Sequence, residues 1–289
     1  MSLRVVGERA AQGPANGPFA SVAVCVDRSA AANDAIGLGK ALAGGDGHLT
    51  LLHAARPLEP LGWASATAPP MDWQELGTEL LERLSHQVPS ADTQLLKGHP
   101  SAAIHDWVEA AQPDVVVCAT HHGAFRRNTL GSVASHLAYQ LPVPVAIART
   151  GIGRRETFTR VAACIDTDGR SDLVLDLSER VAAAYGGEVT AVHVMDDLQR
   201  HTYYGLSPDP DEWLAEWAKA MDDLAGDRDV EQVLLHGDFA GHKISAWAEE
   251  ESIDLLVAAA HRGAVERVLV GGFANHLAHH APCDLLVAR

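Results

Sequence analysis

The fold is decided by the stretch Val115-Val116-Val117-Cys118-Ala119-Thr120-His121-His122-Gly123-Ala124-Phe125-Arg126-Arg127-Asn128-Thr129-Leu130-Gly131-Ser132-Val133-Ala134-Ser135-His136-Leu137. Its first residues form an apolar run typical of a buried parallel strand. A segment rich in Gly, His and Arg follows, which predicts a loop, and Gly131-Ser132 then begins an amphipathic helical pattern. Strand, loop and helix start in this order favour phosphate binding. The loop offers backbone N–H groups, and the helix start offers unpaired donors and the positive end of its dipole.

The same layout occurs a second time near the end of the chain. An apolar run over 255–260 leads into His261-Arg262-Gly263, and Gly271-Gly272 follows. Matching residues of the two halves stand 140 positions apart in the pairs His53/His193, Trp107/Trp247, Asp114/Asp254, Gly123/Gly263, Gly131/Gly271, His136/His276, Pro142/Pro282 and Arg149/Arg289. A repeat this regular indicates a duplicated domain. We therefore expect a flexible leader over 1–18, a first domain over 19–150 and a second domain over 151–289.

Each half alternates strand-length apolar runs with helical patterns, which predicts an α/β domain with a parallel sheet covered on both faces. The first apolar run of the chain ends at Asp27, and the run in the opening stretch ends at Thr120. Ligands of such sheets bind beyond the carboxyl ends of the strands, where the strand order reverses. If these two strands are neighbours, Asp27 and the Gly123 loop share one crevice.

Composition and charge narrow the classes of function. The 289-residue chain is 47% hydrophobic, enough for two domains that each bury a core. Its net charge is −16, with 10 basic and 13 acidic residues up to Arg149 and 12 and 25 thereafter. Because an acidic surface repels phosphate backbones, we expect no nucleic-acid partner.

No apolar run approaches the ~20 residues of a membrane span, and the leader lacks a signal-peptide core. We therefore expect a cytoplasmic protein without a membrane partner.

Cysteine and histidine usage gives weaker signals. The four cysteines lie in apolar runs without metal-binding spacing, which predicts reduced core thiols; a redox pair of Cys25 and Cys118 is the alternative. Sixteen histidines could make the charge respond to mildly acidic pH, although ordinary imidazoles are the favoured interpretation. His276, His279 and His280 share one predicted helix at a spacing that could hold zinc or another transition metal. A solvated helix face is favoured there too, and we expect no metal site.

These residues resemble the universal stress protein family, in its tandem form with two domains in one chain. The resemblance covers 19–289. It rests on the strand ending in Asp27, on His53 and His193, and on three motifs, Gly98-His99-Pro100, Leu130-Gly131-Ser132-Val133 and Leu141-Pro142-Val143-Pro144-Val145. It implies a doubly wound, five-stranded parallel sheet of the Rossmann-like, adenine nucleotide alpha hydrolase-like type in each half, with strand order 3-2-1-4-5. It also implies that the halves pair through their last strands, over 143–148 and 283–288, and that the protein acts in the stress response.

Both halves depart from the loop of the ATP-binding branch of that family, which reads G-x-x-G, nine residues, then G-S or G-T. Thr120 and Ala260 stand in place of the first glycine, and only seven residues separate the next glycine from the last in each half. Two missing residues remove roughly 7 Å of contour from a loop that must wrap a polyphosphate. The second half also has Gly272 where a hydroxyl residue is expected. The first half keeps Ser132 and carries loop arginines, so we expect ATP, with magnesium, or another adenine nucleotide there, and a degenerate second site.

The expected sites combine strand ends, loop and helix start. For the first half they are Val26, Asp27, Ala54, Ala119, Thr120, His122, Gly123, Arg126, Arg127, Gly131, Ser132 and Val133. For the degenerate second half they are Asp166, Val194, Ala260, Arg262, Gly263, Gly271 and Gly272. The resemblance gives Asp27 and Asp166 a contact with adenine or ribose, while a capping or turn role is equally compatible with their positions. No G-x-S-x-G, Walker P-loop, SxxK or HExxH motif is present, so at most slow ATP hydrolysis is expected.

A non-nucleotide interaction or scaffold protein is the alternative. Two irregular inserts, over 57–69 and 196–209, could bind a partner, an apolar ligand or a metal. Tryptophans lie in or beside them, at Trp63, Trp73, Trp213 and Trp217. Packing of these rings onto the sheet is the simpler interpretation. Pairing of whole chains into a homodimer stays open.

Overall fold

The computed structural model describes residues 17–56, 72–123, 126–129, 131–152, 156–166, 169–195, 210–260 and 273–289. The side chains of 121–130 and 210–217 lie outside that description. So do most of the predicted leader, both inserts with Trp63, and the side chains of Trp213 and Trp217. The domain boundaries at 18 and 150 therefore stay a prediction.

The first half contains β1 (Ser21–Cys25), α1 (Ala31–Ala43), β2 (His48–Ala55), α2 (Trp73–Ser85), β3 (Asp92–Lys97), α3 (Pro100–Ala111), β4 (Val115–Ala119), β5 (His121–Gly123), β6 (Arg126–Thr129), α4 (Ser132–Gln140) and β7 (Val145–Ala148). The second half contains β8 (Arg160–Cys164), α5 (Ser171–Tyr185), β9 (Glu188–Met195), α7 (Pro210–Ala225), β10 (Glu231–His236), α8 (Ala240–Glu250), β11 (Leu255–Ala259), α9 (Phe273–His280) and β12 (Asp284–Ala288).

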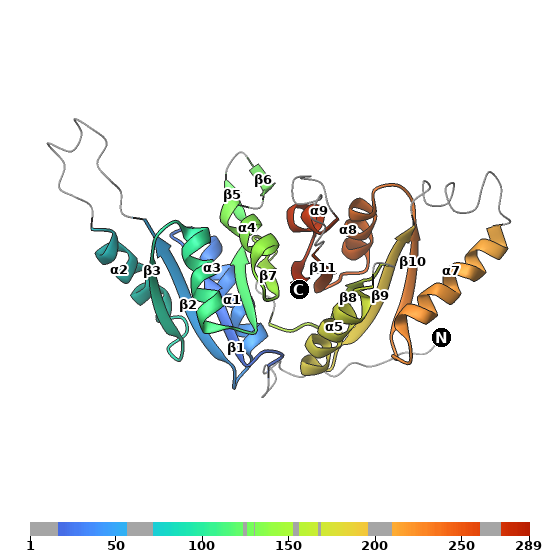
Figure 1. Ribbon diagram of the computed structural model, residues 1–289, viewed down its shortest axis with the longest axis horizontal. Coiled ribbons are helices and arrows are strands. Elements are labelled where there is room, and N and C mark those ends of the chain that lie inside the picture. Colours follow the sequence, from blue (N-terminus) through green and yellow to red (C-terminus); the bar gives the residue numbers. More distant parts are fainter. Residues whose placement is uncertain are drawn as a thin grey trace.

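One ten-stranded sheet runs through both halves in the order β10-β9-β8-β11-β12-β7-β4-β1-β2-β3 (Figure 1). Each half has the order 3-2-1-4-5 that the family resemblance implies, and its strands pair in parallel. The halves join where β7 and β12 pair antiparallel, with Ile147 opposite Leu285 and Val145 opposite Val287. The predicted fold class and the pairing through the last strands are confirmed.

Helices cover the sheet on both faces because the strand residues alternate between two apolar clusters. On β4, Val115 and Val117 belong to the cluster that receives α1, α2, α5 and α7, whereas Val116 and Cys118 belong to the cluster that receives α3, α4, α8 and α9. All four of these side chains are at most 4% exposed. An apolar run without alternating polar residues therefore marks a strand that is buried on both faces.

Local sequence signals set several helix ends. Asp72 caps α2, since its carboxylate accepts hydrogen bonds from Gln74 N at 2.8 Å and Glu75 N at 3.3 Å. Pro100 takes the first position of α3, where its missing N–H costs nothing. Gly186 ends α5 in the left-handed region, at φ 62°.

The opening stretch departs from its prediction in one respect. The segment after β4 was expected as a loop, but β5 and β6 form an antiparallel hairpin in which Gly123 lies opposite Arg126. Its sequence carries no apolar alternation, so no strand pattern is readable, yet pairing the two arms satisfies backbone groups that would otherwise need other partners. The hairpin also contacts α9, so it reaches the other half of the molecule.

Candidate functional site

The first crevice lies where the strand order reverses, between β1 and β4. Val22 pairs with Val115 and Val24 with Val117, so the carboxyl ends of these strands are neighbours. Thr120 follows the end of β4 directly, and Asp27 follows the end of β1 after one residue, Val26. The predicted neighbourhood of Asp27 with the start of the Gly123 hairpin is therefore present. In doubly wound sheets this is the position where ligands bind.

Asp27 holds the turn between β1 and α1. Its Oδ1 accepts hydrogen bonds from the backbone N–H of Ser29 at 2.9 Å and from the Ser29 hydroxyl at 2.5 Å. The helix therefore begins at Ala31, just beyond this turn. The turn role considered for this aspartate is observed, and a contact with adenine or ribose is left to the proposal below.

The floor of this crevice is fixed by a histidine on β2. His53 Nδ1 lies 2.9 Å from the carbonyl oxygen of Val26, and Val26 N donates to Leu52 O at 2.8 Å. The second half repeats this contact, because His193 Nδ1 lies 2.9 Å from Ile165 O. These histidines hold the first strand of each half at its exit, which is a physical reason for their place in both copies.

Thr120 does not act as a strained substitute for glycine. Its backbone φ is not among the positive values of the non-glycine residues. Its side chain is 1% exposed, and its hydroxyl lies 3.2 Å from that of Thr150. Thr150 N also donates to Thr120 Oγ1 at 3.4 Å, which ties the end of β4 to the residue after Arg149. Sequence comparison with the G-x-x-G pattern missed Thr150, because the contact forms only when β4 and β7 lie side by side.

The helix start survives in the first half. Gly131 is the N-cap of α4, with no side chain in the described ranges capping it and no acidic residue in the first turn. Ser132 is exposed and Val133 is half-buried. The N–H groups at this end thus keep the orientation and positive dipole end that attract an anion. Arg126 and Arg127 lie on β6, but their side chains and that of His122 lie outside the described residues.

The second crevice differs in its contents. Arg170, the N-cap of α5, donates a hydrogen bond from Nη1 to the carbonyl of Ala260, just beyond the end of β11. The residue in the same place before α1 is Ala30. Ser171 closes the turn at Asp166, whose carbonyl accepts from the Ser171 hydroxyl at 2.6 Å. A guanidinium therefore reaches the end of β11 in the second half, whereas the N-cap residue at the same place in the first half, Ala30, has only a methyl group.

Other second-site residues are only partly described. Val194 and Ala260 are 7% and 2% exposed, at the ends of β9 and β11. Arg262, Gly263, Gly271 and Gly272 lie outside the described residues. Among the residues that the structure describes, no group of three His, Cys, Asp or Glu side chains is arranged to hold a metal ion.

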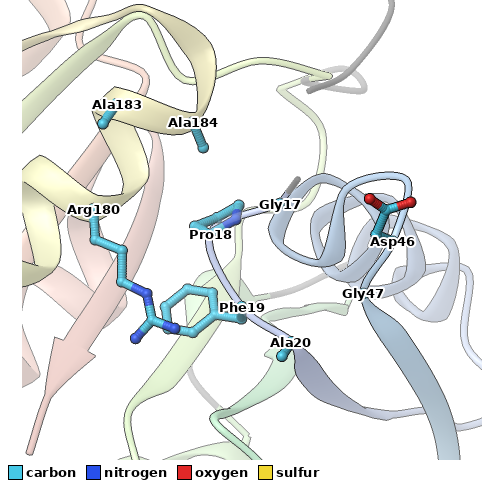
Figure 2. A pocket seen from close by; sticks show the side chains of 9 residues that line it. All are labelled: Gly17, Pro18, Phe19, Ala20, Asp46, Gly47, Arg180, Ala183 and Ala184. Atoms are coloured by element: carbon cyan, nitrogen blue, oxygen red, sulfur yellow. The ribbon is translucent and has the colours of Figure 1, made fainter. Parts of the chain in front are cut away.

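A cavity of about 720 Å³ lies between the two halves, at the amino ends of the strands and so opposite the crevices (Figure 2). Residues 17–20, Asp46 and Gly47 line it from the first half, at the amino ends of β1 and β2, and Arg180, Ala183 and Ala184 line it from α5. The Arg180 guanidinium lies 4.7 Å from the centre of the Phe19 ring. This cation–π contact ties the halves together on the side away from the crevices.

Comparisons with known proteins agree with this architecture. The sequence model described as the universal stress protein family matches residues 18–149 and again residues 157–289. A universal stress protein from Archaeoglobus fulgidus DSM 4304 is 18% identical with a TM-score of 0.70; the match covers 93% of this chain and 98% of that one. A putative universal stress protein from Pseudomonas aeruginosa UCBPP-PA14 is 15% identical with a TM-score of 0.66, covering 93% of both chains.

A shorter neighbour is a family protein from Arabidopsis thaliana solved with AMP bound. It is 20% identical with a TM-score of 0.31, and the match covers 44% of this chain and 90% of that one. No curated protein matches the sequence. None of the helices in the described ranges combines the length and the apolar character that a membrane crossing requires. Because the family model matches nearly the whole chain in two consecutive copies, the chain belongs to the universal stress protein family and is a tandem member of it.

Proposed function

We propose that this protein binds an adenine nucleotide in the first half and serves as a ligand-responsive stress protein, with ATP and magnesium as the first candidate ligand. The observation that carries the proposal is the start of α4 at Gly131-Ser132, which no described side chain caps, in the half where the neighbouring strands β1 and β4 lead to Asp27 and Thr120. A phosphate group at this position would accept from backbone N–H groups and from the Ser132 hydroxyl.

The distribution of net charge also favours nucleotide binding in the first half. The chain up to Arg149 has a net charge of −3, against −13 for the remainder, and Arg126 and Arg127 lie on the hairpin that follows β4. A polyphosphate therefore meets less repulsion in the first half. The shortened loop favours a compact binding mode, in which the hairpin covers the phosphates less completely than a loop two residues longer.

The second crevice is proposed to be degenerate. Arg170 spans it to Ala260, and the hydroxyl position at the following helix is Gly272. A nucleotide would have to displace this guanidinium before reaching the strand ends. In the first crevice the Ser29 hydroxyl that donates to Asp27 holds the turn before α1, and the sequence carries none of the hydrolase motifs named above. The proposed activity is therefore binding, with slow ATP hydrolysis as its limit.

Thermal unfolding of the full chain with and without magnesium and ATP tests this proposal. Ligand that binds only the folded state raises Tm. The variant Ser132→Ala should weaken binding roughly tenfold, because it removes one hydrogen bond to a charged oxygen. Ser135→Ala, on the same helix but one turn farther from the crevice, is the matched control and should bind like the parent protein. The proposal fails if millimolar nucleotide leaves the Tm of the parent unchanged and no nucleotide co-purifies.

A role as an interaction protein is the second candidate, and one residue favours it. Phe239, the N-cap of α8, is 78% exposed and adopts φ 60°, a backbone conformation that costs a non-glycine residue roughly 1–2 kcal/mol. A large apolar ring held outward at that cost fits a contact surface. Sedimentation of the parent and of Phe239→Ala would show whether the ring supports homodimer formation; identical sedimentation across concentrations would remove this candidate.

A further inference from the structure

Three imidazoles from two helices form a continuous stack in the second half. We call it the imidazole stack: His242 of α8, with His276 and His280 of α9. The ring centres of His242 and His276 lie 4.3 Å apart and those of His276 and His280 lie 4.4 Å apart, with tilts of 36° and 32°. The ring centres of His242 and His280 lie 6.3 Å apart, so the three rings form a corner with His276 at its apex. Figure 1 shows α8 and α9 next to each other near the C-terminus.

A glycine makes this approach possible. A Cβ placed on Gly241 of α8 would lie 2.7 Å from Cγ and 2.9 Å from Cβ of His276, closer than side-chain atoms pack. The position matching Gly241 in the first half is Ser101, and no comparable stack forms there. The close contact of His276 with the α8 backbone is thus a property of the second half.

Among the described residues, the surroundings of the imidazole stack are poor in negative charge. His276 Nε2 is buried and has no hydrogen-bond partner among the described residues. The groups that act on it electrostatically are His242, His279 and His280. His280 is influenced in addition by Arg149, which comes from the first half. A proton added to the stack therefore meets other imidazoles and a guanidinium.

Other titratable groups on the elements packed against α9 do not offset this. Asp284 of β12 accepts from the backbone N–H of Arg149 at 2.7 Å. On α8, Lys243 extends toward Gly237, and Glu249 and Glu250 lie at the far end of the helix from His242. Elsewhere, β6 carries Arg126 and Arg127, whose side chains lie outside the described residues.

We propose that the imidazole stack is an acid-sensitive contact, which holds α8 against α9 while its rings are neutral and opens when they take up protons. The opening reaches the seam between the halves, because α9 ends at the carbonyls that Arg149 contacts. Arg149 Nε donates to Ala281 O at 2.5 Å and Nη1 to Ala278 O at 3.3 Å. Acid would thereby loosen the hold of one half on the other.

The titration supports this direction. Burial, with the neighbouring imidazoles, lowers the pKa of His276 to about 4, and burial lowers the pKa of His280 as well. In the unfolded chain a histidine titrates near 6.5. The unfolded state therefore binds more protons between about pH 6.5 and 4. The stability of the contact is fully present above that window and is lost as the pH falls through it.

The first half contains a natural control. His136 occupies the position 140 residues before His276, but the ring recorded beside it among the described residues, His105, lies 6.4 Å away at 66°. His105 also has a carboxylate partner, Glu109, at 3.4 Å. Burial and the nearby His105 and His99 lower the pKa of His136, so a smaller effect of the same sign is expected there. The difference between the pH responses at His136 and His276 therefore separates the effect of the imidazole stack from that of a partly buried histidine.

Hydrogen exchange of the unmodified full chain provides the first test, at about pH 7.5 and about pH 5, on either side of the histidine midpoint. After correction for intrinsic exchange rates, the opening of α8 and α9 should increase about tenfold at the lower pH, relative to the opening of α3 and α4. This factor is smaller than the full pKa shift would give, because solvent screens the charges of the partly exposed rings. Equal changes in the two helix pairs would overturn the proposal.

Two variants provide the second test. In urea unfolding, His276→Gln should lose less stability than the parent between these pH values, and His136→Gln should lose nearly as much as the parent. If His276→Gln loses as much stability as the parent, or if both variants respond alike, the stack is not the acid-sensitive contact. Since the exchange experiment needs no substitution, a variant that fails to fold leaves the proposal testable.

Discussion

Arg149 and Arg289 stand 140 residues apart and reach across the seam in opposite directions. The guanidinium of Arg149 donates to carbonyls at the end of α9, and that of Arg289 donates to the carbonyl of Ala138 on α4. Each arginine follows the last strand of its own half and contacts a helix end of the other. A cation at a helix C-terminus meets unpaired carbonyls and the negative end of the dipole. The duplicated residue thus stabilises the pairing of the halves from both sides.

Removing the Arg149 side chain should destabilise the chain strongly. Arg149 is 6% exposed, and burial lowers the pKa of its guanidinium. Arg149→Met leaves two helix-end carbonyls without their donor, so we expect a loss of about 2–3 kcal/mol in the free energy of urea unfolding. Arg160→Met is the control, since Arg160 forms an exposed pair with Glu251 and should cost at most about 1 kcal/mol. Equal losses for the two variants would contradict the role of Arg149.

Alanine at Gly241 should destabilise, although alanine is the better helix former. The added methyl group would overlap the His276 ring, and overpacking of this kind costs about 1–3 kcal/mol. A second change, His276→Ala, removes the ring atoms that the methyl group would overlap most and leaves only the Cβ. In a double-mutant cycle, Gly241→Ala should therefore cost less once His276→Ala is present. Additive effects in that cycle would show that the two residues do not meet.

The aspartates that precede β4 and β11 should have matching effects. Asp114 Oδ2 accepts from the backbone N–H groups of Ala20 and Ser21, both at 2.9 Å. Asp254 Oδ2 accepts from Thr159 N at 2.9 Å and Arg160 N at 3.0 Å, and from the Thr159 hydroxyl at 3.0 Å. Replacing either by alanine should cost about 1–3 kcal/mol in urea unfolding, with Asp254→Ala the larger because it loses one more bond. A negligible change at both positions would be inconsistent with these contacts.

The thiols should react slowly in the folded protein. Burial raises the pKa of Cys118 to about 12, and burial together with Cys118 raises that of Cys25. Since only the thiolate attacks, a disulfide reagent at neutral pH should label these residues only as fast as the chain unfolds. Burial of the protonated thiols stabilises the fold fully below the pKa of a cysteine in the unfolded chain, near 8.5. This stabilisation is lost as the pH rises toward 12. Rapid stoichiometric labelling of the native chain would argue against burial of these groups.

The sequence anticipated the architecture better than the site. Apolar runs such as 115–119 mark strands because both of their faces are buried, and the resemblance supplied the strand order. The hairpin of β5 and β6 was missed because its sequence has no apolar alternation and its strands are joined through backbone groups. Arg170 and Thr150 were missed for a related reason. Each contacts a strand end that is distant in sequence, so spacing within one motif carries no trace of them.

The imidazole stack could also be predicted only in part from the spacing of its residues. Helical spacing placed His276 and His280 on one face, which the structure confirms through their ring contact. The spacing could not reveal that His242 of α8 completes the stack, nor that Gly241 makes room for it. Tertiary packing of α8 on α9 supplies both facts.

We propose that one half of the duplicated chain binds an adenine nucleotide and the other does not. Isothermal titration of the full chain with ATP and magnesium distinguishes one site from two, because it measures stoichiometry as well as affinity. We expect one nucleotide per chain, with the stoichiometry unchanged in Ser135→Ala and the affinity lowered in Ser132→Ala. Binding of two nucleotides per chain, or no binding at millimolar ligand, would contradict it.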